Sequence, residues 1–244
     1  MEIKAYKKDS EYSYTLGAFP TFELIDAMPE KVIEVLVHST FTDREKLENV
    51  CSKKGIRVSE NNKLIAKLSD KENVYVVGVF EKFEQKLDAK KPHAVFVNPS
   101  NMGNLGTIIR TACGFGIDDI AIIEPAADAF NPKTVRASMG SLFRIRHQNF
   151  ESYEDYMKEF DCDPRKGVCE RAVFTFMLNG TKPLTVADCP KPKLYSLVFG
   201  NEATGLPNEF LEYGTSIIIP QTEHVDSLNL TIAAGIGMYM FTTR

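Results

Sequence analysis

After residue 92 the chain alternates short, nearly continuous apolar runs with stretches of helical periodicity, and this alternation constrains the fold more than any other feature. The runs are rich in Val, Ile and Phe, which is typical of strands buried on both faces. The sequence therefore predicts an α/β fold with a parallel sheet covered on both faces. The predicted strands are 94–98, 120–123, 143–147, 172–178, 195–200 and 215–220. The helical patterns begin near Asn104, Asn131, Ser152 and Pro207, and a last one covers 227–242.

The N-terminal third shows a shorter pattern of the same kind. Three predicted strands, at 32–39, 56–60 and 74–80, alternate with helical segments, which indicates a small αβα module. A polar stretch that ends at Pro92 separates this module from the longer pattern. We therefore expect three regions, namely an N-terminal domain over 1–85, a linker over 86–92 and a C-terminal domain over 93–244.

Cysteine usage and the length of the apolar runs indicate the compartment. The five cysteines form no CxxC pair, which favours a reduced, cytoplasmic protein without a disulfide framework or a zinc site. No apolar run approaches the roughly 18 residues that cross a bilayer. The N-terminus has no apolar stretch of the kind found in secretory signals. We therefore expect neither a membrane nor a metal as a partner.

The formal net charge is −4, but its distribution along the chain matters more than its total. The segment 151–170 alone contains seven acidic and three basic side chains. Two other stretches, 89–117 and 129–150, contain basic side chains and no acidic ones. Because a phosphate backbone responds to the local potential, such stretches can bind nucleic acid. The candidate RNA contacts are Lys133, Arg136, Arg144 and Arg146, with a solvated surface as the alternative.

A glycine-containing turn follows the first predicted strand of the C-terminal domain and opens a helix. Asn104 is a natural N-cap there, and the free N–H groups of such a turn attract an anion. Arg110 follows among Ile and Ala residues, where a buried guanidinium would need an anionic partner or a phosphate. A solvent-exposed arginine beside a carboxylate is the alternative. The turn lacks the GxGxxG pattern, which argues against a dinucleotide-dependent dehydrogenase.

Two later segments place polar residues directly after buried strands. Asn201 and Glu202 follow the strand that ends at Gly200, and α/β proteins bind ligands at the carboxyl ends of parallel strands. The alternative is that Glu202 caps a helix and Gly200 serves a tight turn. After the last strand, Ser227 and Asn229 lead a helix, and Ser227 would suffice as its N-cap.

These three segments, in this order, resemble the SpoU-type (TrmH-like) RNA ribose methyltransferases of the SPOUT superfamily. The resemblance rests on NLGTIIRTA (104–112), LVFGNEATGL (197–206) and IPQTEHVDSLNLTIA (219–233), and it covers about 93–244. It implies a sheet that ends in a deep trefoil knot, an exception to the rule of unthreaded connections. The N-terminal module is similar, by pattern only, to the ribosomal-protein-type RNA-binding domain that many members carry.

The resemblance also implies an activity, the transfer of a methyl group from S-adenosylmethionine to a ribose 2′-hydroxyl of RNA without a metal. The cofactor contacts carried over by motif are Gly200, Ile219 and Leu228. The catalytic group carried over is Arg110, with Asn104, Glu202, Ser227 and Asn229 around it. Because a guanidinium stays protonated up to about pH 12, we expect Arg110 to act as a fixed cation for phosphate and alkoxide. Glu202 would orient Arg110 or the ribose.

Members of this family work as homodimers. The small residues of 233–237 suit close packing, against a second subunit or against the chain itself. The sequence departs from the family pattern at Ala203, Gln221 and His224, all beside the expected cofactor pocket. Ribosomal RNA is favoured over transfer RNA as the substrate. Two alternatives remain, namely a catalytically inactive RNA-binding or assembly factor on the same fold, and a methyltransferase directed at a base.

Overall fold

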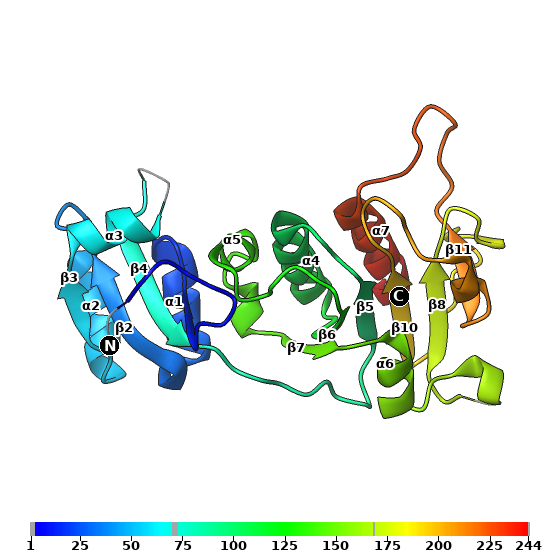
Figure 1. The fold of residues 1–244 in the computed structure, drawn as a ribbon, viewed down its shortest axis with the longest axis horizontal. Helices are drawn as coiled ribbons and strands as arrows, with labels where there is room; N and C mark the ends of the chain where they lie inside the picture. Colours follow the sequence, from blue (N-terminus) through cyan, green and yellow to red (C-terminus); the bar gives the residue numbers. More distant parts are fainter. Residues whose placement is uncertain (1–2, 70–72, 168, 244) are drawn as a thin grey trace. The chain divides into compact units, whose positions relative to one another are not determined.

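The chain divides into two compact units, which are described separately (Figure 1). The computed structural model describes residues 3–69, 73–167 and 169–243. The N-terminal unit comprises Met1–Phe83 and Asp128–Arg144, and the C-terminal unit comprises Glu84–Ala127 and Ile145–Arg244. The division after Phe83 lies next to the predicted linker. The segment Asp128–Arg144, which lies within the predicted range 93–244, groups with the N-terminal unit.

The N-terminal unit is built on a four-stranded sheet with the order β1-β4-β2-β3. Its strands are β1 (Tyr12–Tyr14), β2 (Val32–Val37), β3 (Val58–Glu60) and β4 (Val76–Glu81). Its helices are α1 (Ala18–Ala27), α2 (Arg44–Lys53), α3 (Asn62–Leu68) and α5 (Pro132–Ala137), with 3-10 turns η1 (Pro29–Lys31) and η2 (Ser141–Phe143). All three strands predicted here are present. β1 was not predicted, because three residues are too few to show a period.

Residues 128–144 complete the packing of the N-terminal unit. The Ser13 hydroxyl donates a hydrogen bond to the Phe130 carbonyl at 2.5 Å, and the Phe143 ring meets Phe80 edge-on at 5.0 Å between centroids. Phe143 therefore belongs to this core and lies in η2 rather than in a strand. The predicted strand over 143–147 was wrong in its bounds for this reason, since the strand of that region begins at Arg146.

The C-terminal unit contains a seven-stranded sheet with the order β7-β6-β5-β10-β8-β11-β9, and every neighbouring pair is parallel. Its strands are β5 (His93–Val97), β6 (Asp119–Ile123), β7 (Arg146–Phe150), β8 (Ala172–Phe176), β9 (Lys182–Pro183), β10 (Tyr195–Phe199) and β11 (Thr215–Ile218). Its helices are α4 (Met102–Phe115), α6 (Tyr153–Glu159) and α7 (Leu230–Thr242), with 3-10 turns η3 (Pro164–Lys166) and η4 (Asn208–Leu211). The predicted parallel sheet is confirmed.

Alternate strand residues of the C-terminal sheet face two helical layers. Val95 and Val198 join one buried cluster with Tyr156 and Met157 of α6. Helices α4 and α7 contact each other, and α7 also contacts β10 (Figure 1). The sheet is therefore covered on both faces, as the continuous apolar runs predict.

The small residues of α7 allow a close approach within the chain itself. A Cβ atom at Gly237 would lie 2.8 Å from Cζ of Phe176 and 2.9 Å from Cζ of Phe199. Ala234 is fully buried. Of the two alternatives for these small residues, packing against the chain's own sheet explains these two positions.

The predicted linker is fixed to the C-terminal unit. Leu87 is buried in the same cluster as α6, and its N–H donates to Oε1 of Gln148 on β7 at 3.0 Å. The N–H of Asp88 donates to Oδ1 of Asp119, at the start of β6, at 2.7 Å. These residues therefore pack as part of the C-terminal unit.

Candidate functional site

Three loops lie at one edge of the C-terminal sheet. They follow β5, β10 and β11, whose neighbours are all parallel, so their carboxyl ends point the same way. The loops cover 98–101, 200–207 and 219–229. Each contains one of the polar segments that the sequence singled out, and this edge is where α/β proteins bind ligands.

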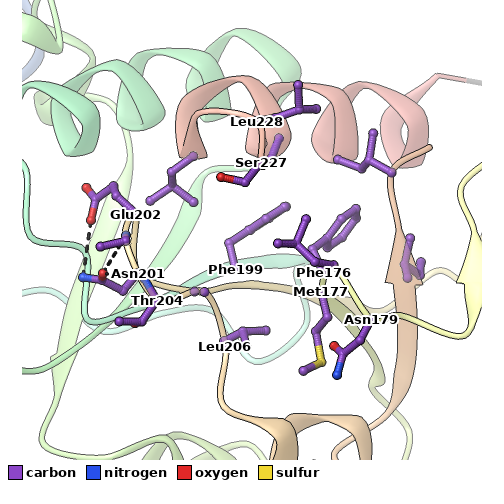
Figure 2. Close-up of a pocket in the computed structure, with 18 of the residues that line it drawn as sticks. Phe176, Met177, Asn179, Phe199, Asn201, Glu202, Thr204, Leu206, Ser227 and Leu228 are labelled. Carbon is purple, nitrogen blue, oxygen red and sulfur yellow. Dashed lines mark hydrogen bonds between the residues drawn. The ribbon is translucent and has the colours of Figure 1, made fainter. Parts of the chain in front are cut away.

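A cavity of about 330 Å³ lies between the second and third of these loops, the residues that follow β8 and the start of α7 (Figure 2). It brings together five of the predicted site residues, namely Gly200, Glu202, Ile219, Ser227 and Leu228. Figure 2 shows Asn201, Glu202 and Thr204 on one side of Phe199, with Met177 and Asn179 on the other. The remaining predicted catalytic residues, Asn104, Arg110 and Asn229, do not line the cavity.

Glu202 is the best connected side chain of the site. Its carboxylate accepts hydrogen bonds from the N–H and the hydroxyl of Ser100, both at 3.0 Å, and from the N–H of Asn101 at 3.1 Å. The Asn104 amide donates a further bond at 3.2 Å. Partial burial raises the pKa of Glu202, but these donors outweigh it and the net pKa is lowered. Glu202 is therefore an anion that holds the N-terminus of α4, and its bonds go to that turn rather than to Arg110.

Arg110 lies on the exposed face of α4. Its neighbours Ile108, Ile109 and Ala112 point into the core, because residues one or two positions apart face different directions on a helix. The prediction of a guanidinium enclosed by apolar side chains was therefore wrong. The alternative is confirmed in its exposure but not in its carboxylate neighbour. Within the described part of the chain, Arg110 makes no side-chain hydrogen bond or ion pair.

Both helices at the site begin at a different residue from the predicted one. The N-cap of α4 is Asn101, whose side chain accepts the N–H of Asn104 at 3.0 Å. The N-cap of α7 is Asn229, whose Oδ1 accepts the N–H of Thr231 at 2.8 Å. Asn104 and Ser227 were wrong as cap predictions, and the physical reason is that an equally good cap residue lies three residues earlier or two later.

Position 200 requires a glycine because the backbone of the following turn leaves no room for a side chain. A Cβ atom there would overlap the Gly205 carbonyl and the Leu206 nitrogen. The turn folds back at this point, since Asn201 and Gly205 form an isolated antiparallel bridge. The tight-turn alternative for Gly200 is thus correct, and the residue still lines the cavity.

The three departures from the family motifs differ in position. Ala203 and Gln221 line the cavity, whereas His224 is an exposed loop residue. Ala203 is exposed, and its N–H donates to Oδ1 of Asn201 at 2.8 Å.

Two of the four candidate RNA contacts are already in ion pairs. In the N-terminal unit, Arg144 binds Glu23 at 2.6 Å and Asp26 at 2.9 Å. In the C-terminal unit, Arg146 binds the fully buried Asp119 through two nitrogens, which raises the pKa of Arg146. Lys133 and Arg136 are exposed on α5, and no ion pair of either is found among the described residues.

Several residues of the site were not predicted. They are the cavity residues Phe176, Asn179 and Thr204, and the loop residues Asn98, Ser100 and Asn101. The position of Asn98 at the end of the predicted strand 94–98 is the one signal that could have drawn attention to its loop. The cavity residues of β8 carry no such signal, because the sequence does not show which strands are neighbours.

Two features are absent from the described residues, a cluster of metal-ligating side chains and a membrane-spanning helix. Over 3–69, 73–167 and 169–243, no group of three or more His, Cys, Asp or Glu side chains could hold a metal ion. The helices of the same ranges include none with the length and apolarity needed to cross a bilayer.

The fold and the cavity together define a class, an α/β protein with a ligand-sized site at the carboxyl edge of a parallel sheet. The model of the SpoU rRNA Methylase family matches residues 91–239. The chain belongs to this family. The match covers all three motifs and confirms the resemblance drawn from them.

Two curated relatives are enzymes of ribosomal RNA. The 23S rRNA (guanosine(2553)-2′-O)-methyltransferase RlmP of Bacillus subtilis is 33% identical over 159 residues, which is 64% of this chain and 60% of RlmP. The 23S rRNA (uridine(2479)-2′-O)-methyltransferase of Streptomyces viridochromogenes is 32% identical over 59% of this chain and 50% of that protein. The chain thus spans between half and two thirds of the length of these relatives.

Solved structures match almost the whole chain. The AdoMet-bound rRNA methyltransferase of Sinorhizobium meliloti is 29% identical, with a TM-score of 0.75 over 94% of this chain and 86% of that chain. The SpoU methyltransferase AviRb of Streptomyces viridochromogenes, in complex with AdoMet, is 23% identical, with a TM-score of 0.79 over 94% of this chain and 89% of that chain. The second likeness shows a shared fold alone.

Proposed function

We propose that this protein transfers the methyl group of S-adenosylmethionine to a ribose 2′-hydroxyl of RNA, with ribosomal RNA as the favoured substrate. The observation that carries the proposal is one cavity lined by two of the motifs, with Gly200 and Glu202 from one and Ile219, Ser227 and Leu228 from the other. Membership of the SpoU family supports it, as do relatives named as ribosomal RNA 2′-O-methyltransferases.

The cavity fits S-adenosylmethionine by its size and by its walls. A volume of about 330 Å³ suffices for a small-molecule site. Phe176 and Leu206 offer apolar walls to an adenine, and backbone groups at the strand ends can bind its polar edge. The residues that would hold the cofactor are Gly200, Ile219 and Leu228. When bound, the cofactor supplies an electrophilic methyl group on a positively charged sulfur.

Arg110 is the proposed cation for the RNA. Its exposed guanidinium has five N–H donors in a planar fork, which suits bidentate binding of a phosphate. Since it stays protonated, it cannot accept the proton of the ribose hydroxyl, and the adjacent phosphate or water would receive that proton. In this proposal Arg110 orients the RNA and stabilises the developing alkoxide.

The other motif residues support this arrangement in different ways. Glu202 and Asn104 fix the N-terminus of the helix that carries Arg110. Asn229 holds the first turn of α7. Ser227 lines the cavity, so its hydroxyl is the one of these groups that we assign to the substrate.

We also propose that RNA lies over α5 in the N-terminal unit, with Lys133 and Arg136 as phosphate contacts of little base specificity. For Arg144 and Arg146, a phosphate would have to compete with the carboxylates that they already bind. A contribution of these two residues to RNA binding stays a prediction, and we expect it to be the smaller one. The role of the N-terminal unit as an RNA-binding domain is part of the same proposal.

A homodimer through α7 completes the proposal. Ile232 and Tyr239 are 54% and 52% exposed and lie on one face, because seven residues make about two helical turns. We expect light scattering to give twice the mass of one chain, and Ile232→Asp to shift the protein toward the monomer. Val186→Asp is the matched control, since Val186 is 86% exposed outside this helix. A wild-type protein with the mass of one chain would contradict the dimer.

The deep trefoil knot and the cytoplasmic location remain proposals as well. Helix α7 follows β11 along the chain and packs against α4 and β10. This path supports a C-terminal segment that is threaded through a loop. The shared fold with the SpoU methyltransferase AviRb supports it further. An experimental map that traces 200–243 tests the knot, and a segment that passes beside the 201–205 turn without threading would exclude it.

The decisive experiment is transfer of a radiolabelled methyl group to unmodified RNA. The substrates are transcripts of 23S and 16S ribosomal RNA and a transfer RNA pool, made in vitro. We expect label in ribosomal RNA at a linkage that resists alkali, because a 2′-O-methyl group blocks cleavage there. Label on a base would favour the base-directed alternative. RNA binding without cofactor binding in calorimetry would favour the inactive RNA-binding factor.

A further inference from the structure

The side chain of Asn201 joins two loops of the site. Its Oδ1 accepts the N–H of Ala203 at 2.8 Å and of Thr204 at 3.3 Å, which shapes the turn that lines the cavity. Its Nδ2 donates to the carbonyl oxygen of Asn98 at 2.7 Å. One amide therefore both shapes the turn and binds it to the loop after β5.

Asn98 presents that carbonyl oxygen through an unusual backbone conformation. Its φ of 52° lies in the left-handed region, which asparagine adopts more readily than other residues with a side chain. Its Nδ2 donates to the carbonyl oxygen of Glu124 at 2.7 Å, and its N–H donates to that of Ile123 at 2.9 Å. The direction of the Asn98 carbonyl is thus fixed by the end of β6.

The loop that begins at Asn98 leads directly into α4. Ser100 and Asn101 follow, and their N–H groups bind Glu202 of the cavity turn. The turn and the helix that carries Arg110 are therefore connected twice, once through Asn201 and once through Glu202. Figure 2 shows Asn201 and Glu202 next to each other on the same side of the cavity.

We propose that Asn98 and Asn201 are positioning residues, which hold the cavity turn and the helix that carries Arg110 in the relative position that methyl transfer requires. This inference rests on the proposed function. In-line transfer depends on the relative placement of the methyl donor and the ribose, and an error of about 1 Å can cost on the order of 100-fold in rate. The alternative is that the two amides only stabilise the fold.

The variant Asn201→Asp separates the two bonds of this amide. The carboxylate keeps an acceptor for the N–H groups of Ala203 and Thr204, but it can no longer donate to the Asn98 carbonyl or, at 3.5 Å, to the Glu202 carboxylate. We expect cofactor affinity close to wild type and a kcat about 10- to 100-fold lower with a 23S ribosomal RNA transcript. Asn201→Ala removes both bonds, so we expect cofactor affinity and kcat to fall together.

Substitutions at Asn98 separate the backbone from the side chain. Asn98→Gly keeps access to a positive φ, whereas Asn98→Ala does not. If the carbonyl direction is what matters, the glycine variant keeps most of its turnover and the alanine variant loses it. Equal losses in both variants would overturn the role assigned to the backbone of Asn98.

The matched control is Ser152→Ala, which removes the N-cap of α6 in the same unit. We expect it to lower Tm without changing kcat or cofactor affinity, and Tm is measured for every variant. Wild-type kcat in Asn201→Asp, or losses that follow Tm across all variants, would overturn this inference alone. A wild-type protein that transfers no methyl group to RNA would overturn the proposed function and this inference with it.

Discussion

The two edges of the C-terminal sheet carry polar networks of opposite character. At the carboxyl edge, Glu202 and Asn201 line a cavity. At the amino edge, Arg171 is only 2% exposed, and its guanidinium donates to the carbonyls of Ala89, Lys91 and Tyr195 at 2.8 to 2.9 Å. The amino-edge network is closed to solvent, because Arg171 is buried and both its Nη atoms donate to groups of the chain.

This difference shows that a shifted pKa does not by itself mark a functional site. Burial, with a smaller effect of Arg171, lowers the pKa of His93 at the amino edge to about 4. Burial also lowers the pKa of Arg171. The pKa of Glu202 is lowered as well, but its side chain lines a cavity. Perturbed groups mark a site when they also face space that a ligand can enter.

The largest effect that we expect is from Arg110→Ala, on the helix that begins at the carboxyl edge. Loss of the cation should lower methyl transfer about 100- to 1,000-fold, the range found when a transition-state donor is removed. Stability should change by less than about 0.5 kcal/mol, since the side chain is exposed. Radiolabel transfer and thermal unfolding measure the two quantities. Near-normal turnover in Arg110→Lys, with intact cofactor binding, would exclude the bidentate role.

The matching change at the amino edge is Arg171→Met. It leaves the carbonyls of Ala89, Lys91 and Tyr195 without their buried donor, so we expect a loss of about 3 kcal/mol in the free energy of unfolding. The kcat of the folded variant should stay close to wild type. A large loss of kcat with little loss of stability would mean that the two edges do not differ as described.

A smaller effect should appear in the pH dependence of stability. His93 has a pKa of about 4 in the folded protein and about 6.5 when unfolded. Between these values the unfolded chain binds a proton that the folded protein does not, so the free energy of unfolding falls as pH falls. We expect a loss of about 2 kcal/mol from pH 7.5 to pH 5. Urea unfolding of His93→Gln should lack this component, and an unchanged slope would contradict the assignment.

The smallest effect is expected from Asn229→Ala. Loss of the N-cap of α7 should lower the free energy of unfolding by about 1 kcal/mol. Asn229→Ser should restore most of it, since serine is also a good N-cap. If the serine variant is as stable as wild type but does not transfer methyl groups, then Asn229 acts on the substrate as well as on the helix.

Most strands of the C-terminal unit were predictable because they are local apolar runs, which β7 and β9 are not. Their order was not, since β10 lies between β5 and β8 although it follows both along the chain. The partner of Phe143 was not predictable either, because the sequence does not show whether an apolar residue packs on Phe80 or in the C-terminal sheet. Local periodicity carries no information about the partner.

The candidate site divides in the same way. Glu202 was predicted from its position after a strand, but the donors that hold it come from Ser100, Asn101 and Asn104, about a hundred residues earlier. Arg110 was predicted from its motif, but its exposure depends on which face of α4 meets the core. Asn98 was not predicted as a site residue, because the amino-acid sequence does not show that its φ angle is positive.

By itself, the amino-acid sequence determined where most strands and helices lie and which polar segments follow the buried strands, since these depend on side chains close together in the chain. Only the tertiary structure decided that Asn98 meets Asn201, that Arg171 is enclosed at the opposite edge, and that a cavity opens between the loops. Such contacts join residues far apart in sequence, and the packing of the whole sheet sets their distances.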